Sequence, residues 1–396
     1  MFAPEGLTTG RPVVGALVLL LSALLALAFA NSAYSPFYIH FWRTDHVLPG
    51  GLVVTAQAVV DKGLMTLFFL AVGLELKREL TYGALRHPKV MALPLLSAVG
   101  GMVAPALLYY SLNQGGQTLR GWGIPMSTDI AFAVGALALL GGRVPRNLMI
   151  FMLALAIVDD LGAILVIAIY YSHQARIEPL MVALAIFAVL LFLNRCQVRG
   201  LSSYLGLGTL LWLALGLAGV DAPLAGVLVA AAIPASDPAR APGSPRLTPT
   251  DRLERGLVRP VTFVLMPLFA FANAGLVFSA HDLTASTAVT AGIFLGLLFG
   301  KFIGIGAVAW LALRWRIAHL PSGVTYYHVL GVAWLGGIGF TMALFINALA
   351  FAPGPERIAG KLGILIASPL AAALGMAWLF CGARPRPILT GGPTRP

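Results

Sequence analysis

The sequence predicts an all-α polytopic membrane protein with about twelve transmembrane helices, on three observations. Of its 396 residues, 59% are hydrophobic and only 10% are charged, whereas soluble domains are about 25% charged. Apolar runs of the length that crosses a bilayer, about 20 residues, recur from one end to the other. Lys and Arg gather in the connections on one side of these runs. We therefore expect a single transmembrane domain over residues 1–380.

The apolar runs, taken in order, give the predicted helices. The first run ends in Ala28-Phe29-Ala30, which is similar to a signal-peptide cleavage site, but it is longer than a signal core and is expected to be retained. The seventh and eighth runs are short and are divided at Gly219–Asp221. The twelve runs are Pro12–Ala30, Thr55–Leu76, Val90–Leu112, Trp122–Leu140, Leu148–Tyr171, Leu180–Leu193, Leu201–Leu217, Ala222–Ile233, Val258–Val277, Val289–Leu313, Val324–Leu349 and Leu362–Phe380.

The basic residues predict the orientation. Of 26 Lys and Arg residues, 19 lie on the side of the two termini, six lie on the opposite side, and Lys301 lies within a run. The positive-inside rule then places both termini in the cytoplasm. The net charge of +11 indicates orientation and not nucleic-acid binding, because the basic residues form no patch with interleaved aromatic side chains.

Three connections have recognisable character. Residues Ile39–Thr55 alternate weakly around Pro49-Gly50-Gly51, which predicts an external β-hairpin. Residues Asp237–Thr250 are rich in Pro, Ser and Arg and predict a flexible cytoplasmic loop, and residues 381–396 predict a disordered cytoplasmic tail.

Four ionisable residues lie deep inside apolar runs, namely Asp129, Asp159, Asp160 and Lys301. A charged residue at the centre of a membrane helix costs about 2.5–3.5 kcal/mol on insertion scales, so such residues usually mark function. A purely structural salt bridge accounts for Lys301 and one aspartate, and it leaves two aspartates without partners.

Two of the runs contain residues that disfavour a continuous helix. Pro125 removes a backbone donor in the fourth run, next to the hydroxyls of Ser127 and Thr128. The eleventh run contains Gly336-Gly337-Ile-Gly339, although glycines at this density also suit tight packing. Interrupted helices in corresponding positions of two halves are typical of a transporter site.

Carboxylates, hydroxyls and freed carbonyls suit a hard cation. No His or Cys lies near the middle of these runs, which argues against zinc, copper or iron, and no cofactor is expected. The same carboxylates bind protons, so a cation and protons would compete for one site, and the neighbouring Asp159 and Asp160 should titrate as a coupled unit.

A second charged cluster, Glu75, Lys77, Arg78 and Glu79, ends the second run, and Glu254 opens the ninth run on the same side. The simpler interpretation is a solvated helix end with internal ion pairs. The functional interpretation is a charged mouth that gathers cations and responds to pH.

At these residues the chain resembles the NhaA-type sodium/proton antiporter family. The matching stretches occur in order from about Pro12 to Phe380: Gly73-Leu-Glu75-Leu-Lys77-Arg78-Glu79-Leu, Pro125-Met-Ser-Thr128-Asp129-Ile-Ala-Phe, Ala156-Ile-Val-Asp159-Asp160-Leu-Gly-Ala, Leu268-Phe-Ala-Phe-Ala-Asn273-Ala-Gly, Gly300-Lys301 and Gly337-Ile-Gly-Phe-Thr341-Met.

The resemblance implies inverted-topology repeats, whose interrupted fourth and eleventh helices cross near the midplane. It implies that Asp159 and Asp160 carry the transported sodium and protons, and that Lys301 pairs with Asp159. It further implies that Thr128 and Asp129 lie at the crossing of the interrupted helices. There Asp129 would offset the helix-end dipoles and help to hold sodium.

The resemblance also implies a pH-response cluster of Glu75, Glu79 and Glu254, a homodimer formed through Ile39–Thr55, and a place in the bacterial inner membrane among its lipids. The chain departs from the family at Asp221, Arg255 and Arg259, where histidine is common. These departures put the pH set-point in doubt and leave exchange itself untouched.

The sequence thus predicts an electrogenic antiporter, not an enzyme, that exports Na⁺ or Li⁺ in exchange for more than one H⁺ and serves pH homeostasis and salt tolerance. Two alternatives remain open. One is a Na⁺- or H⁺-coupled organic anion symporter of related fold that uses Lys301 for its substrate. The other is an intramembrane aspartyl hydrolase, which fits poorly because Asp159 and Asp160 point about 100° apart on one helix.

Overall fold

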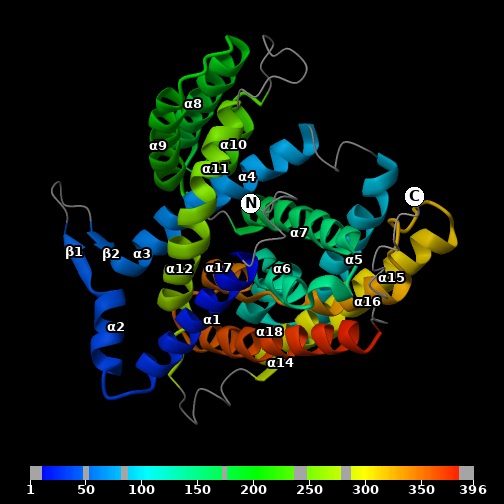
Figure 1. The fold of residues 1–396 in the computed structure, drawn as a ribbon. Helices are drawn as coiled ribbons and strands as arrows, with labels where there is room; N and C mark the ends of the chain where they lie inside the picture. The colour runs from blue at the N-terminus through cyan, green and yellow to red at the C-terminus, as the bar shows by residue number, and fades with distance from the viewer. Residues whose placement is uncertain are drawn as a thin grey trace, which may run out of the picture.

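The fold was analysed in a computed structural model that describes residues 11–47, 53–81, 88–171, 176–235, 248–277 and 287–382. Figure 1 shows that these residues form a bundle of helices with one small hairpin at its edge. The prediction of an all-α polytopic membrane protein is confirmed. The helices are α1 (Arg11–Ala30), α2 (Ser35–Arg43), α3 (Ala56–Ala58), α4 (Met65–Thr81), α5 (Pro88–Leu112), α6 (Ile130–Leu139), α7 (Arg146–Val166), α8 (Ile177–Arg195), α9 (Leu201–Ala218), α10 (Leu224–Ala232), α11 (Pro249–Pro260), α12 (Met266–Asn273), α14 (Thr287–Leu295), α15 (Lys301–Arg314), α16 (Tyr326–Leu335), α17 (Phe340–Ala350) and α18 (Pro355–Gly382).

Several helices continue through turns of different pitch. π-Helical turns at Val59–Leu64, Ile167–Tyr171, Val261–Leu265 and Gly296–Gly300 join or extend neighbouring α-helices, and 3₁₀ segments cover Gly116–Met126 and Gly141–Arg143. Such π turns are frequent at functional sites. The last of the four leads directly into Lys301.

Among the described residues, eight helices are long and apolar enough to cross a membrane, or ten if each of two bent pairs counts as one span. The predicted runs Thr55–Leu76 and Ala222–Ile233 are not among them, so the number twelve stays a prediction. The seventh and eighth runs do separate where expected: α9 is followed by Gly219, which has a left-handed φ of 77°, a conformation that glycine adopts without strain.

Both predicted interruptions are present in the structure. The 3₁₀ segment Gly116–Met126 and α6 meet at 41°, and α16 and α17 meet at 48°. The backbone N–H of Asp129 in the first break donates to the carbonyl of Ile338 in the second, at 2.6 Å. The two breaks therefore cross in direct contact inside the bundle.

Close backbone packing brings Lys301 to this crossing. Helices α5 and α15 approach so tightly that a Cβ placed on Gly304 would lie 2.1 Å from the carbonyl oxygen of Gly100. Small residues allow such an approach, which is common between membrane helices. Lys301 begins α15 on the buried side of this contact and is 0% exposed.

The predicted hairpin is shorter than Ile39–Thr55. Strand β1 (Asp45–Val47) pairs antiparallel with β2 (Val53–Thr55), with Asp45 opposite Thr55. Residues Ile39–Arg43 instead belong to helix α2, so the predicted start of the hairpin was wrong.

Packing against α12 explains why residues Ser35–Arg43 form helix α2. Tyr38 and Trp42 are four residues apart on α2, are both buried, and make edge-on contacts with Phe271 of α12. A spacing of four residues places both rings on one helical face, and this contact outweighs the weak alternation in the sequence.

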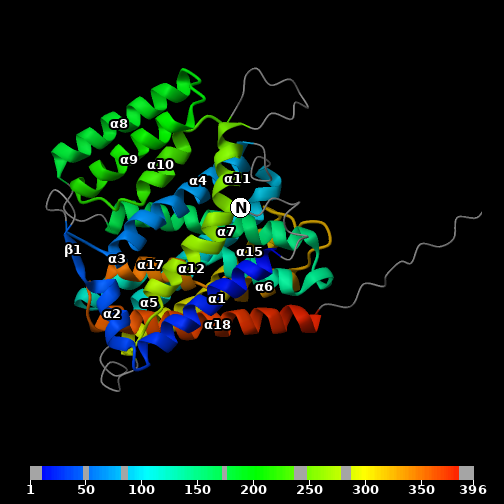
Figure 2. The same ribbon diagram turned by 60° about the vertical axis from the view of Figure 1, so that its left-hand side comes forward.

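Two groups of elements lie at the edges of the helix bundle. Figure 2 shows α8 and α9 side by side at one edge of the bundle, with β1 and α2 at another. Most of the predicted loop Asp237–Thr250 and all but the first two residues of the predicted 381–396 tail lie outside the described residues. Within the described part, Thr248 opens α11 through a capping box with Asp251.

Candidate ion-binding site

Asp129 joins the two interrupted helices. Its Oδ1 accepts a hydrogen bond from the backbone N–H of Phe132 at 3.2 Å, which caps the start of α6. Its Oδ2 accepts from the backbone N–H of Thr341 at 3.0 Å and from the Thr341 hydroxyl at 2.5 Å, at the start of α17. One carboxylate therefore faces the N-terminal ends of two half-helices, where the helix dipoles and free N–H groups favour negative charge.

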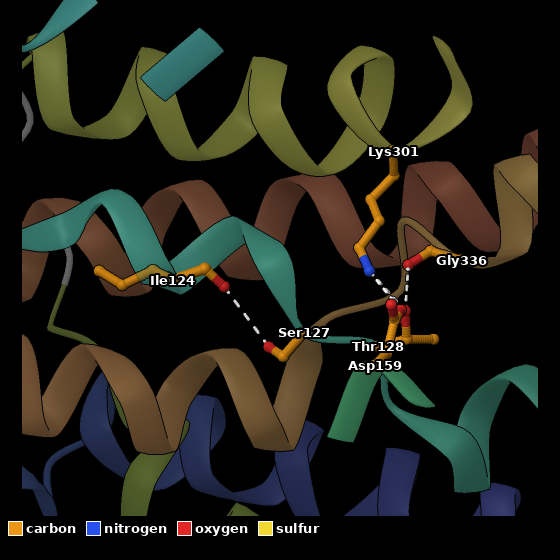
Figure 3. Close-up of polar contacts among 6 residues, drawn as sticks. All are labelled: Ile124, Ser127, Thr128, Asp159, Lys301 and Gly336. Carbon is orange, nitrogen blue, oxygen red and sulfur yellow. Dashed lines mark hydrogen bonds and ion pairs between the residues drawn. The ribbon is translucent and has the colours of Figure 1, made fainter. Parts of the chain in front are cut away.

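Lys301 extends from α15 towards Thr128 and Asp159, which lie side by side, as Figure 3 shows. Its ammonium forms an ion pair with Asp159 Oδ2 and donates to Thr128 Oγ1 at 3.0 Å. The Thr128 hydroxyl in turn lies 2.6 Å from Asp159 Oδ2 and 2.9 Å from the carbonyl of Gly336 in the second break. All three side chains are 0% exposed. The lysine is thus held by a carboxylate on α7 and a hydroxyl at the crossing.

Asp160 is the neighbour of Asp159 on α7 and has a different environment. It is 0% exposed, and neither of its carboxylate oxygens accepts a hydrogen bond from any residue that the structure describes. Asp159 Oδ1 is likewise without a donor among those residues. A buried carboxylate without hydrogen bonds is strongly destabilising unless a proton or a cation neutralises it. This part of α7 therefore offers three oxygens to a proton or a metal cation.

Two small cavities lie beside Thr341, and one of them reaches Asp129. The first, about 10 Å³, is lined by Glu75, Asp129 and Thr341 together with apolar side chains. The second, also about 10 Å³, is lined by Leu64, Phe269, Thr341 and neighbouring apolar residues. A volume of this size is close to the least that holds one water molecule. Thr341 lines both cavities, together with Phe68 and Met266, and Glu75 lines the first of them with Asp129.

The second charged cluster is centred on Arg78. Its guanidinium bonds Glu79 at 3.0 Å and also forms an ion pair with Glu254 of α11. Glu75, one turn earlier on α4, is 3% exposed, as is Glu254. The structure therefore brings all three predicted glutamates to the facing ends of α4 and α11.

Lys77 ties the same end of α4 to α10. Its ammonium donates to the carbonyl of Ala231 at 2.6 Å and to that of Ile233. Carbonyls at a helix C-terminus lack intrahelical donors, and a cation there is favourable. The basic residues of this cluster therefore join α4 to α10 and α11, which differs from a solvated helix end with internal ion pairs alone, and Glu75 extends the cluster towards the crossing.

Comparison with known proteins decides the family. The pattern of the Na+/H+ antiporter 1 family matches residues 8–379. The chain is 44% identical to "Na(+)/H(+) antiporter NhaA" of Syntrophobacter fumaroxidans over an alignment of 428 residues. The alignment covers 95% of this chain and 90% of the relative. The chain is 42% identical over 425 residues to the protein of that name from Acidithiobacillus ferrooxidans, covering 96% and 98%. It is 45% identical over 379 residues to that of Escherichia coli O1:K1 / APEC, covering 94% and 96%.

The chain belongs to the Na+/H+ antiporter 1 family. The predicted resemblance is therefore confirmed, and the family is one of secondary transporters and not of enzymes. Within it, the interrupted helices and the buried Asp–Lys pair occupy the positions that the motifs indicated.

A further buried acid, Asp221, lies between α9 and α10. Burial raises the pKa of Asp221 to about 7; the negative charge of Asp61 adds to this effect and the positive charge of Lys62 opposes it. Asp61 itself accepts a hydrogen bond from Asn273 Nδ2 at 2.6 Å.

Thr341 and Asn273 were not predicted as site residues, although each stands in a stretch that carries the resemblance. A usable signal existed for Thr341, a hydroxyl residue two positions after the glycines of the second break. No local signal marks Arg78 as the partner of Glu254, because the two are 176 residues apart in sequence.

Proposed function

We propose that this chain exchanges Na⁺ or Li⁺ for more than one H⁺ per cation, electrogenically, at Asp159, Asp160 and Lys301. The observation that carries the proposal is Asp160, whose buried carboxylate has no hydrogen-bond donor among the described residues and lies next to the Lys301–Asp159 ion pair. Oxygen ligands of this kind suit a hard monovalent cation as well as a proton. Family membership supports sodium and protons as the exchanged ions.

The protons balance as follows. In the proton-loaded site Asp160 is neutral, and the charges of Asp159 and Lys301 cancel. When Na⁺ binds both carboxylates, Asp160 releases its proton, and Lys301, which loses its anionic partner to the ion, releases a second one. The sodium-loaded site then holds two carboxylates, one Na⁺ and a neutral lysine. One net positive charge is left to move inward for each sodium exported, and an inward-negative potential supplies about 2.3 kcal/mol per 100 mV for that charge.

Alternating access requires the site to open to each side in turn. Asp129, Asp159, Asp160 and Lys301 are all 0% exposed, so the described structure holds the site closed. The breaks join short half-helices through irregular backbone, which is where helices can reorient with little loss of hydrogen bonding. Asp129 would then hold the N-terminal ends of both half-helices through each cycle.

Two alternatives receive less support from these contacts. An organic anion symporter would need Lys301 free for its substrate, yet Lys301 is engaged by Asp159 and Thr128. An aspartyl hydrolase would need a second carboxylate facing Asp159 or Asp160, and Asp129 instead caps two helix ends.

For the surroundings of the site, we propose that both termini face the cytoplasm of a bacterial inner membrane, as the distribution of basic residues indicates. The Arg78 ion pairs and the cavity shared with Asp129 support Glu75, Glu79 and Glu254 as a pH-response cluster. The exposed strand β1 at the edge of the molecule supports the hairpin as the contact of a homodimer.

Proteoliposomes test the proposal. Sodium is added outside vesicles that hold the purified chain, and internal pH and membrane potential are followed with dyes. We expect sodium entry to drive proton exit and to generate a potential, and we expect Asp160→Asn to abolish both signals. Glu178→Gln, which changes an exposed glutamate at the start of α8, should keep them. Full exchange by Asp160→Asn, or movement of sodium and protons in the same direction, would contradict the proposal.

A further inference from the structure

An apolar groove of about 360 Å³ runs along the outside of the bundle. Its walls are α1 on one side and α18 on the other, and its floor is α6 with Ile338 and Phe340 of the second break. Figure 2 shows α1 passing across α6 and α18 at this face. Several wall residues, such as Leu17 and Leu24, are about half exposed, at 49% and 52%. The groove is therefore open along its length to whatever surrounds the transmembrane helices.

We propose that this groove binds one acyl chain of an anionic phospholipid, whose phosphate is held by Arg143. The lipid comes from the leaflet on the side of the two chain termini, because the groove's Val13 and Met376 lie near those termini. Helices α1 and α18 are both long and apolar enough to cross the membrane, so hydrocarbon is what this surface meets.

The length of the groove fits a chain from one leaflet. On α18 it extends from Leu365 to Met376, about 17 Å at 1.5 Å per residue. On α1 it extends from Val13 to Leu27, about 21 Å by the same rise. One leaflet contributes about 15 Å of the hydrocarbon core. A single acyl chain that enters the groove beside Met376 therefore reaches the depth of the break between α16 and α17.

An arginine side chain lies at the end of the groove where the acyl chain would enter. Arg143 is exposed, and its guanidinium carbon lies 4.0 Å from the centre of the Phe380 ring. Leu139 and Met376, which line the groove, precede Arg143 and Phe380 by four residues each. Because Met376 and Phe380 both belong to α18, Phe380 lies about one helical turn beyond the groove, with Arg143 against its ring. An aromatic ring and an arginine at this level suit the headgroup region and an anionic phosphate.

The floor of the groove gives the lipid a structural consequence. The carbonyl of Ile338 accepts from Asp129, and the N–H of Phe340 donates to Ser368 Oγ at 3.2 Å; Ile338, Phe340 and Ser368 all line the groove. Irregular backbone at membrane depth is tolerated only where it is shielded from lipid or lines a cavity. An acyl chain in the groove covers the apolar side chains that shield this break.

Photo-crosslinking tests the proposal on the full chain in phosphatidylcholine nanodiscs. Phosphatidylglycerol with a diazirine on its acyl chain is added at low mole fraction, and labelled peptides are mapped by mass spectrometry. We expect labelling of the groove residues of α1, α6 and α18. Arg143→Gln should reduce it about fivefold, the ratio that corresponds to about 1 kcal/mol for one cation near an anionic headgroup. A phosphatidylcholine that carries the same diazirine should label the groove of the unchanged chain as weakly as phosphatidylglycerol labels the Arg143→Gln variant.

Two matched controls and a blocking variant complete the design. Arg314→Gln removes an exposed arginine at the end of α15, and Ala185→Phe enlarges an exposed alanine on α8; both should leave groove labelling unchanged. Ala373→Phe fills the groove from an exposed position and should abolish labelling without disturbing the core. Labelling no stronger in the groove than around Ala185, or labelling unaffected by both Arg143→Gln and Ala373→Phe, would overturn the proposal.

Discussion

The buried ion pair of Lys301 with Asp159 allows a quantitative prediction. Both side chains are 0% exposed, and the pair is supported by the Thr128 hydroxyl. Lys301→Met leaves the Asp159 carboxylate buried without its cation, and Asp159→Asn leaves the ammonium without its anion. Breaking a buried pair in this way costs about 3–5 kcal/mol.

The double variant Asp159→Asn/Lys301→Met should recover most of that loss. It removes both charges, and the amide that replaces the Asp159 carboxylate can still bond Thr128. Replacing both members of a buried pair is often close to neutral. We therefore expect each single variant to lose about 3–5 kcal/mol and the double variant to lose much less than the larger single loss.

The assay is chemical denaturation of the purified chain in mixed micelles at neutral pH. Glu79→Gln serves as the control, because its ion pair with Arg78 is 21% exposed on both sides, and a pair of this kind contributes at most about 1 kcal/mol. Single-variant losses that simply add in the double variant would show that the two groups do not act as a pair and would refute the reasoning.

Three further changes test other contacts. Thr341→Val removes the hydroxyl donor to Asp129 at 2.5 Å and should cost about 1.5–3 kcal/mol in the same denaturation assay, whereas Thr341→Ser should not. Gly304→Ala places a methyl group 2.1 Å from the Gly100 oxygen, so we expect a loss of about 1–3 kcal/mol or more and slower transport; an unchanged transport rate would count against close α5–α15 packing. Because burial raises the pKa of Asp221 to about 7, its protonated form favours the fold, and the melting temperature relative to Asp221→Asn should fall as pH rises from about 4 to about 7. Parallel melting curves across that range would contradict this pKa.

Local chemistry explains which parts of the fold the sequence predicted. Pro125 and the glycines around Gly337 disfavour a helix wherever they stand, so both breaks were found where they lie. Helix α2 was missed because it depends on contacts of Tyr38 and Trp42 with Phe271, which lies 233 residues after Tyr38 in sequence. No pattern within Ile39–Arg43 carries that information.

The candidate site was likewise predictable from the sequence only in part. Asp159, Asp160 and Lys301 could be singled out because charges in apolar runs are costly regardless of their partners. The hydrogen bonds of Asp129 could not be predicted, because the bond from Thr341 to Asp129 joins residues 212 apart in sequence. The positions at which two helices cross determine such pairs, and sequence periodicity determines only the face of one helix. That Asp160 accepts no hydrogen bond from the described residues is likewise visible only in three dimensions.

The most direct test of the exchange chemistry is the number of protons released when sodium binds. Purified protein in weakly buffered detergent solution is mixed with NaCl, and released protons and bound ²²Na⁺ are counted across a pH series. The exchange proposed for Asp160, Asp159 and Lys301 predicts more than one proton released per sodium bound, and neither sodium binding nor proton release in Asp160→Asn. Sodium binding without proton release, or unchanged binding by that variant, would contradict it.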